Sequence, residues 1–241
     1  MDEDTLKQFQ EISQILRKRI YSIQMPQAVI LDLDSTLLAA YGKQEGRAFN
    51  FHYRSNGYHP LVCYDGITGD LIKIQLRDGA AYSCTGVTDF LQPILDEYLN
   101  DYPTIHLLLR GDSGFATPDL YKQCEENGTS YVIRLMENFI KESKSGFDFS
   151  AVSSHNRIVN ANRVQVHALA YNIFNWFRRL VLSAKMRKQR IDTVRLKLLK
   201  IATKVVHSAR YITFKLCSSC PYKEEFYDTL SAIGKLNVQL E

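Results

Sequence analysis

Two carboxylates stand in an apolar stretch near the N-terminal end of the sequence. Residues 28–38 have the sequence AVILDLDSTLL, and their apolar positions, bounded upstream by Pro26, predict a buried strand. Asp32 and Asp34 lie two residues apart, so on a strand their side chains point the same way. Because an unpartnered buried charge costs several kcal/mol, such acids indicate a metal ion, a basic partner or catalysis. The alternative is that Asp34 only ends the strand and caps the following turn.

Acids also follow two later predicted elements. Residues 105–109 predict a second short buried strand, and the turn after it places Asp112 just past the strand end. Residues 130–135 predict another strand, followed at residues 137–144 by a helix that begins with Glu137. Carboxylates at such places can hold two Mg²⁺ ions about 3.5–4 Å apart for in-line displacement at phosphorus.

The elements that must position these acids follow a definite order. Hydrophobic periodicity and turn residues predict a leading helix (2–19), a β-hairpin (58–64 and 70–76) and two later helices (89–98 and 118–127). Three strands in hairpin order, then alternating helices and strands, resemble the arrangement of an RNase H-like nucleotidyl transferase. The predicted fold class is α/β, an RNase H-like mixed sheet flanked by helices with an α-rich C-terminal extension.

The C-terminal part is predicted to be mainly helical. Its expected elements are a long helix (162–188), a second helix (193–208), a strand (211–216) and a final helix (224–236). The predicted domains are an N-terminal helix and lead-in (1–27), an RNase H-like catalytic core (28–145) and a C-terminal helical region (146–241). The last region is expected to complete the core and to carry basic helices.

Positive charge is concentrated in one segment. The chain has a net charge of +4, but residues 178–204 hold ten Lys/Arg and one acid, which leaves −5 elsewhere. Such a segment is either a solvated helical face or a surface that binds a polyanion. No apolar run reaches the ~20 residues that span a bilayer, and the N-terminus is acidic rather than signal-like. Five cysteines without framework spacing fit a reducing compartment, so we expect a cytoplasmic protein without a membrane partner.

The segment DLDST at residues 32–36 resembles the opening motif of haloacid dehalogenase-like phosphatases. In that interpretation Asp32 is the nucleophile and Asp34 the general acid and base, with Mg²⁺ beside them. That fold needs a parallel sheet of strand–helix units, whereas here a hairpin follows the motif. The phosphatase stays an alternative.

Five segments together resemble the DDE transposases of bacterial insertion sequences, the large group with a Tyr-Arg-Glu-Lys signature. They are DLDSTLLAAYGKQEG (32–46), HYRSNGYHPL (52–61), LRGDSGFATPDLY (109–121), ENFIKESK (137–144) and ANRVQVHALAYN (161–172). The resemblance implies that Asp34, Asp112 and Glu137 are the catalytic acids and hold two Mg²⁺ or Mn²⁺ ions. It also implies that Lys144, the match to the signature lysine, contacts DNA near the transferred end.

The same resemblance implies an activity and partners. Transposases of this kind cut and join double-stranded DNA, both transposon ends and target, by two-metal phosphoryl transfer, in the bacterial cytoplasm at the nucleoid. A homodimer is compatible with the resemblance.

Two departures from the family accompany the resemblance. A mainly β inserted domain normally separates the strand after the second acid from the helix of the third, yet here Arg134 and Glu137 are three residues apart. The long N-terminal portion that binds the element's ends is also lacking. The chain is therefore expected to be a shortened transposase, with an inactive DNA-binding remnant as the alternative.

Basic residues of several segments are expected to contact DNA. Besides Lys144, they are Arg110, Lys43, Arg54, Arg178, Arg179, Arg187, Lys188 and Arg190. Cys217 and Cys220 form a CxxC pair, but a structural zinc ion takes four ligands and the sequence has no second pair.

Overall fold

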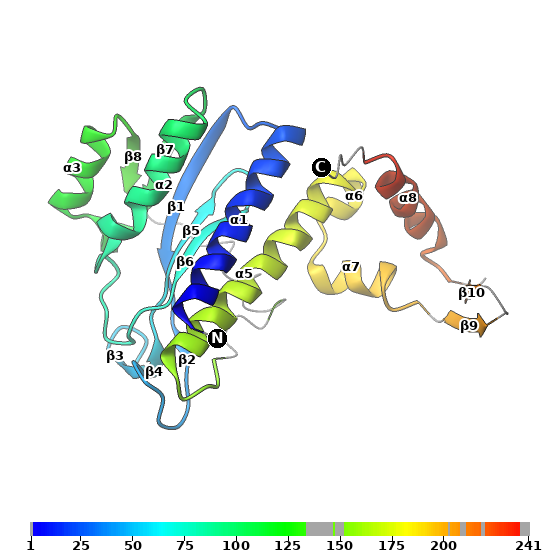
Figure 1. Ribbon diagram of the computed structural model, residues 1–241, viewed down its shortest axis with the longest axis horizontal. Helices are drawn as coiled ribbons and strands as arrows, with labels where there is room; N and C mark the ends of the chain where they lie inside the picture. Colours follow the sequence, from blue (N-terminus) through cyan, green and yellow to red (C-terminus); the bar gives the residue numbers. More distant parts are fainter. Residues whose placement is uncertain are drawn as a thin grey trace. The chain divides into compact units, whose positions relative to one another are not determined.

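The computed structural model divides the chain into two compact units, Met1–Ile173 and Phe174–Glu241 (Figure 1). The structure describes residues 2–133, 147, 152–201, 203–207, 211–217 and 220–236. Glu137, Lys144 and the helix expected around them lie outside the described residues. The domain boundary expected between residues 145 and 146 lies there too, and it stays a prediction.

A five-stranded mixed sheet organises the first unit. In spatial order its strands are β6 (Leu71–Gln75), β5 (Leu61–Asp65), β1 (Ala28–Ser35), β7 (His106–Gly111) and β8 (Ser130–Ile133). β5 is antiparallel to both β1 and β6, whereas β7 is parallel to β1 and β8 is parallel to β7. This order, with three antiparallel strands followed by two that run parallel to the central one, confirms the predicted RNase H-like α/β fold class.

Helices cover one face of the sheet because alternate strand residues are apolar. Along β1, Val29, Leu31 and Leu33 are at most 3% exposed, and they share a core cluster with α2 (Val87–Asp101) and α3 (Pro118–Glu126). Asp32 and Asp34 alternate with these residues and therefore point to the opposite face.

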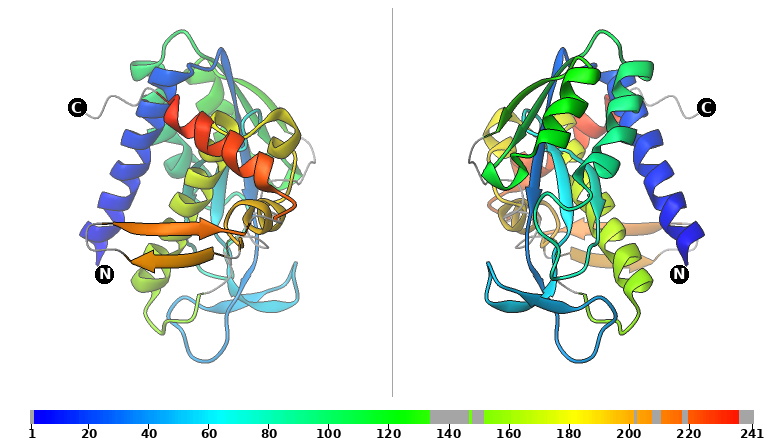
Figure 2. Two further views of the ribbon diagram at one scale, coloured as in Figure 1. Left: turned by 90° about the vertical axis from the view of Figure 1, so that its right-hand side faces the viewer. Right: turned by 90° about the vertical axis from the view of Figure 1, so that its left-hand side faces the viewer.

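The opposite face packs against the first part of α5 (Arg157–Leu180). Val62, Tyr64 and Ile74 of the sheet form a second core cluster with Val164 and Tyr171 of that helix. Figure 2 shows α5 and α2 on different sides of the strands. Asp32 and Asp34 thus lie on the α5 side of the sheet, near the C-terminal end of β1.

Side chains of α1 (Glu3–Ile23) and α5 close the outer edge of β6. Arg17 donates to the carbonyl of Ile72 at 3.2 Å, and Gln165 donates to the carbonyl of Ile74 at 2.7 Å. The Asn172 amide bonds both the N–H and the carbonyl of Leu71, each at 2.7 Å. Because an open edge invites pairing with other chains, these contacts protect the sheet.

A second, small sheet follows β1 and was not predicted. It consists of β2 (Leu38–Ala39), β4 (Ser55–Tyr58) and β3 (Ala48–Asn50), in that spatial order. Tyr58 belongs to β4, so the hairpin strand expected at residues 58–64 begins later, at Leu61. Pro60 accounts for the break, because proline has no N–H to donate to a sheet ladder.

The second unit contains short helices and one hairpin. After the last turns of α5 come α6 (Ala184–Arg187), α7 (Ile191–Leu198), β9 (Thr203–His207), β10 (Ile212–Leu216) and α8 (Lys223–Gly234). The long helix expected at 162–188 instead begins at Arg157 and ends at Leu180. The helix expected at 193–208 is wrong beyond Leu198, because Val205 and Val206 pair with β10 as β-branched strand residues.

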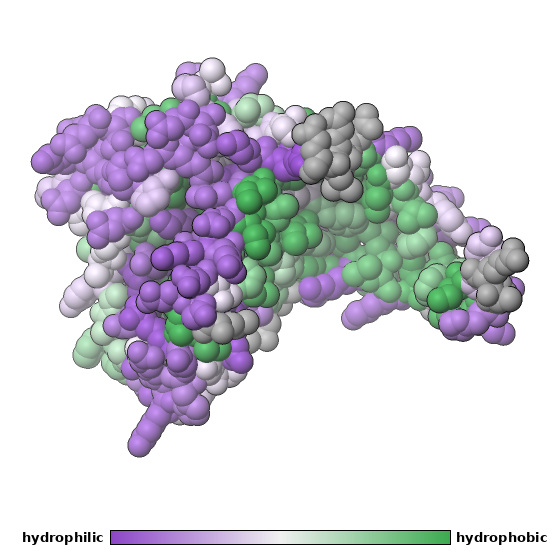
Figure 3. All heavy atoms as spheres, viewed as in Figure 1, coloured by the Kyte–Doolittle hydropathy of each residue, from purple (hydrophilic) through white to green (hydrophobic). Residues whose placement is uncertain are grey.

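This unit has a small core and many exposed apolar side chains. Leu182, Met186, Val194 and Leu198 form its buried cluster. Hydrophobic residues also gather on the surface of this unit (Figure 3). The exposed large ones are Leu196, Leu199, Val205, Tyr211, Ile212, Phe214, Tyr227, Leu230 and Ile233. None of the described helices is both long enough and apolar enough to cross a bilayer.

Candidate active site

The ends of β1 and β7 bring two of the predicted acids together. The two strands are parallel, and Leu33 pairs with Gly111 at the last position of their register. Asp34 and Asp112 each come one residue later, so they follow this pair side by side. Adjacent strands lie about 4.8 Å apart, so both acids lie at the same end of the sheet, where β1 and β7 terminate.

Backbone N–H groups orient both carboxylates. Asp34 Oδ1 accepts from the Ser35 N–H at 2.6 Å, and Asp112 Oδ1 accepts from the Gly114 N–H at 2.8 Å. Asp112 is thereby the N-cap of the 3-10 turn η1 (Ser113–Phe115). Both acids are half-buried, and charged oxygens held in this way suit a hard cation.

Gly114 allows the close approach of a neighbouring loop. A Cβ at this position would lie 2.9 Å from Asp112 Oδ1 and 3.0 Å from the Ser83 Cβ. Any other residue at position 114 would push the carboxylate or the loop away.

The Asp32 carboxylate forms an ion pair with Arg110. Arg110 Nε and Nη2 donate to the two carboxylate oxygens of Asp32 at 2.9 and 2.5 Å. Hydrogen bonding to Asp32 raises the pKa of Arg110 above its ordinary value. A carboxylate held by two bonds is poorly suited to act as a nucleophile, and β1 has an antiparallel neighbour in β5. Both observations count against the phosphatase alternative.

The loop at residues 78–86, between β6 and α2, forms one wall of the site. Ser83 Oγ lies 3.0 Å from Ser35 Oγ, directly beside Asp34. Arg77, which is 6% exposed, fixes the loop by donating to the carbonyls of Ser83 and Thr85 at 3.1 and 2.6 Å. Burial lowers the pKa of Arg77 to about 10. Sequence reasoning missed this loop, although its glycines and small residues signal an irregular connection.

Two aromatic residues that flank β4 approach the same end of β1, Tyr53 from the turn between β3 and β4 and His59 from just after β4. The Tyr53 hydroxyl donates to the Ser35 carbonyl at 3.3 Å, and its ring centroid lies 5.8 Å from that of His59. His59 Nδ1 lies 2.7 Å from the carbonyl of Ala81, in the wall loop. Burial lowers the pKa of His59 below its ordinary value.

The basic residues expected to bind DNA are not all in one place. Lys43 and Arg54 are exposed in the first unit, and Arg54 adopts a left-handed backbone with a φ of 48°. Arg187, Lys188 and Arg190 are exposed in the second unit. Arg178 and Arg179 in the second unit are half-buried, and the Arg178 guanidinium lies 4.8 Å from the Phe174 ring centre.

Within the described ranges, no three His, Cys, Asp or Glu side chains cluster as metal ligands do. Asp34 and Asp112 are two of the three acids expected to hold metal ions, and Glu137 is among the residues not described. Cys217 is exposed and Cys220 half-buried, so the CxxC pair gains no further ligand in the part of the chain that the structure describes.

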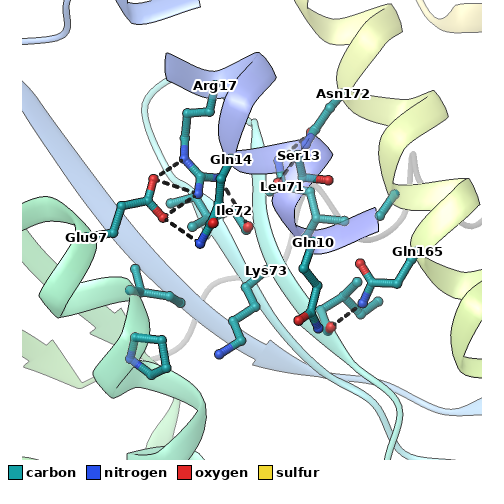
Figure 4. Close-up of a pocket in the computed structure, with 14 residues that line it drawn as sticks. Gln10, Ser13, Gln14, Arg17, Leu71, Ile72, Lys73, Glu97, Gln165 and Asn172 are labelled. Atoms are coloured by element: carbon teal, nitrogen blue, oxygen red, sulfur yellow. Dashed lines mark hydrogen bonds and ion pairs between the residues drawn. The ribbon is translucent and has the colours of Figure 1, made fainter. Parts of the chain in front are cut away.

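A polar cavity of about 180 Å³ lies between α1, β6, α2 and α5 (Figure 4). Its charged side chains are engaged with protein groups. Arg17 Nε and Nη2 donate to Glu97 at 2.7 to 3.0 Å, and Lys73 Nζ donates to the Phe90 carbonyl at 2.8 Å. Burial lowers the pKa of Lys73. These contacts fasten the helices over the sheet edge, which is a structural role.

Comparison with known proteins gives one family and several solved structures. The family described as transposase DDE domain group 1 matches the chain twice, over residues 1–138 and 135–238. No curated protein sequence matches.

The solved structures that are similar to this chain include transposases. The piggyBac transposase synaptic complex with hairpin DNA matches with 18% identity and a TM-score of 0.30, covering 45% of this chain but 23% of the piggyBac chain. The catalytic domain of Mos1 mariner transposase matches with 8% identity and a TM-score of 0.36, covering 73% of this chain and 96% of that domain. The Mos1 transposase paired-end complex with left transposon end has 10% identity, a TM-score of 0.32 and coverages of 73% and 63%.

Proposed function

The chain belongs to the transposase DDE domain group 1 family, and we propose that it acts as a nucleotidyl transferase that cuts and joins DNA. The observation that carries this proposal is the placement of Asp34 and Asp112 at the ends of two adjacent parallel strands. In the proposed site Glu137 is the third catalytic acid.

The donor set fits a divalent cation. Asp34 and Asp112 offer half-buried carboxylate oxygens already oriented by backbone N–H groups, and Mg²⁺ and Mn²⁺ favour such oxygen ligands. We propose that these two acids and Glu137 hold two such ions. When bound, the ions would activate the attacking oxygen and stabilise the leaving oxygen at phosphorus.

The other groups around the acids have positioning roles in this proposal. The Ser35–Ser83 contact and Arg77 hold the wall loop against β1, so the two carboxylates keep a fixed separation. Arg110 neutralises Asp32, which leaves Asp34 as the acid of β1 that is directed to the site.

We propose that DNA is held by basic residues of both units. In the first unit they are Lys43, Arg54, Arg110 and Lys144, which lie in the segments whose sequences resemble the family. In the second they are Arg178, Arg179, Arg187, Lys188 and Arg190. The second unit, residues 174–241, has 14 Lys/Arg and 5 Asp/Glu, a net charge of +9, which leaves −5 for residues 1–173. Such a basic unit is expected to bind the phosphates of duplex DNA, transposon ends and target alike.

We further propose that the chain is a shortened form that lacks an inserted domain. The two family matches meet at residues 135–138, the junction where that domain is expected. An origin in a bacterial insertion sequence, a cytoplasmic nucleoid location and a homodimer belong to the same proposal. The junction also favours a second candidate function, an inactive remnant that binds DNA without cutting it.

Nicking of supercoiled plasmid in Mg²⁺ or Mn²⁺ tests the proposed chemistry. Asp34→Asn and Asp112→Asn are expected to lower the rate more than about 100-fold, and chelation of the metal to abolish it. Asp119→Asn, which changes an exposed acid in the first turn of α3, is the matched control and keeps its activity. Asp32→Asn is expected to destabilise the fold through Arg110 but to keep nicking.

Each contrary result has a defined meaning. Nicking that survives Asp112→Asn contradicts the proposed site. Salt-sensitive DNA binding without nicking by the parent protein identifies the remnant. Hydrolysis of a small phosphoester that is lost in Asp32→Asn identifies the phosphatase.

A further inference from the structure

The hairpin of β9 and β10 has one basic face and one apolar face. In its antiparallel register Lys204 lies directly opposite Lys215, and Val205 lies opposite Phe214. Since neighbouring strand residues point to opposite faces, the two lysines share one face and Val205 and Phe214 share the other. The two strands form a sheet of their own, with no third strand among the described residues.

The lysine pair is unfavourable in the protein alone. Directly opposite residues have Cβ atoms about 5 Å apart, and like charges at that distance destabilise a hairpin. Neither Lys204 nor Lys215 has an acidic partner within the described residues, and both are exposed. An anion between or across the two ammonium groups would remove this repulsion.

Part of the apolar face of the hairpin adjoins the unit's own helices, although Val205 and Phe214 stay 48% and 65% exposed. Phe214 and Leu216 line a hollow of about 330 Å³ together with Leu198 of α7, Phe226 of α8 and Ile201. Leu198 belongs to the buried cluster of this unit, and Phe226 packs against it. Lys204 and Lys215 lie on the other face of the hairpin, and both are exposed.

We propose that the lysine face of the β9–β10 hairpin binds the phosphate backbone of duplex DNA. The inference rests on the proposed function, which makes DNA the partner, and it assigns a contact surface beyond the residues named there. A two-stranded ribbon fits the width of a DNA groove, and the net charge of +9 on residues 174–241 is complementary to the phosphates. The occupant of this face is duplex DNA, whose phosphates supply the anions that the lysine pair lacks.

Lys204→Glu in the full chain separates binding from folding. The new carboxylate would face Lys215 and form a favourable cross-strand pair, so the melting temperature is expected to stay equal or to rise. Duplex DNA binding, measured without divalent metal, is expected to weaken by about tenfold or more at 0.1 M salt. The slope of log K against log salt should fall by at least about 0.9, the contribution of one phosphate contact.

The matched control is Lys223→Glu. Lys223 is exposed in the first turn of α8, so its replacement makes the same change in net charge in the same unit at a position that favours an acid. The proposal predicts that this control keeps most of the parent's affinity and salt dependence. Equal losses in both variants, or no loss in Lys204→Glu, would overturn it.

Two further results keep the test decisive. If Lys204→Glu lowers the melting temperature, the variant Lys204→Gln/Lys215→Gln removes the repulsion without an acid, and the same comparison of slopes decides. The outcome is also separate from that of the proposed chemistry. The parent protein could bind duplex DNA with the predicted contribution of the hairpin and yet fail to nick it. That result would support the DNA-binding surface on the hairpin and contradict the proposed cleavage activity.

Discussion

The two units of this protein differ in charge and in packing. Residues 1–173 carry a net charge of −5 and enclose two large core clusters, whereas residues 174–241 carry +9 and one small cluster. The carboxylates of the candidate site lie in the first unit, and most of the basic residues expected to bind DNA lie in the second. Catalytic acids need a rigid setting, while attraction to a polyanion depends mainly on the number of charges. We infer that cleavage and the larger part of DNA affinity are divided between the units.

The largest effect is expected where the packing of the first unit includes a buried ion pair. Glu97→Gln leaves the Arg17 guanidinium without a counter-charge, and the two side chains are only 5% and 12% exposed in the order Arg17, Glu97. Removing one partner of such a pair costs about 3–5 kcal/mol of unfolding free energy. Urea unfolding followed by circular dichroism measures this loss.

A control for this variant lies one turn further along α2. Asp101→Asn breaks the ion pair with Lys18, whose side chains are 67% and 45% exposed in the order Lys18, Asp101, so less than about 1 kcal/mol is expected. Similar losses of unfolding free energy in Glu97→Gln and Asp101→Asn would contradict a stabilising role of the buried Arg17–Glu97 pair.

The next effect tests the charge of the second unit. The triple variant Arg187→Gln, Lys188→Gln and Arg190→Gln should lower the salt dependence of duplex binding by about 2.7 in the slope of log K, with nicking chemistry per bound complex unchanged. The control variant Lys7→Gln, Arg19→Gln and Lys122→Gln removes three exposed charges from the first unit. An equal change in the control would erase the division between the units.

The smallest effect concerns the pH dependence of the first unit. Burial lowers the pKa of His59 below its ordinary value of 6.5, so the folded protein binds this proton less readily than the unfolded chain does. The stability present above pH 6.5 is therefore lost as the pH falls through 6.5 toward the folded value. His59→Gln should reduce this pH dependence of the unfolding free energy, while His106→Gln, at an exposed position, should leave it unchanged. A parental curve that is flat between pH 7 and 5 would contradict the assignment.

The sequence was informative where apolar periodicity is strong. Strands β1 and β7 with their terminal acids, and helix α3, were predictable because each depends on neighbouring residues. The cap of α3 is likewise local, since the Thr117 hydroxyl accepts from the Leu120 N–H at 3.4 Å. The resemblance implied that Asp34 and Asp112 share one site, but the parallel pairing of β1 and β7 that places them side by side was not predicted.

Features that depend on tertiary contacts were missed. Arg110 was expected to contact DNA, and its bond to Asp32 was missed because it depends on the register of β1 with β7, which places the two residues opposite each other. The wall loop is held by Arg77 and Ser83, which reach groups of other elements, and no local pattern announces such contacts. The segment of residues 203–207 was predicted as helix because its partner strand lies several residues ahead and pairing outweighs local propensity.

The measurement that tests the central claim most directly is thermal unfolding of the purified protein with and without Mn²⁺, beside Asp112→Ala. A ligand that binds only the folded state adds about 2.7 kcal/mol at 100 times its dissociation constant. We expect a cooperative transition whose melting temperature Mn²⁺ raises in the parent and leaves unchanged in Asp112→Ala. A parent indifferent to Mn²⁺, or a variant that gains as much as the parent, would contradict a divalent-metal site at Asp34 and Asp112.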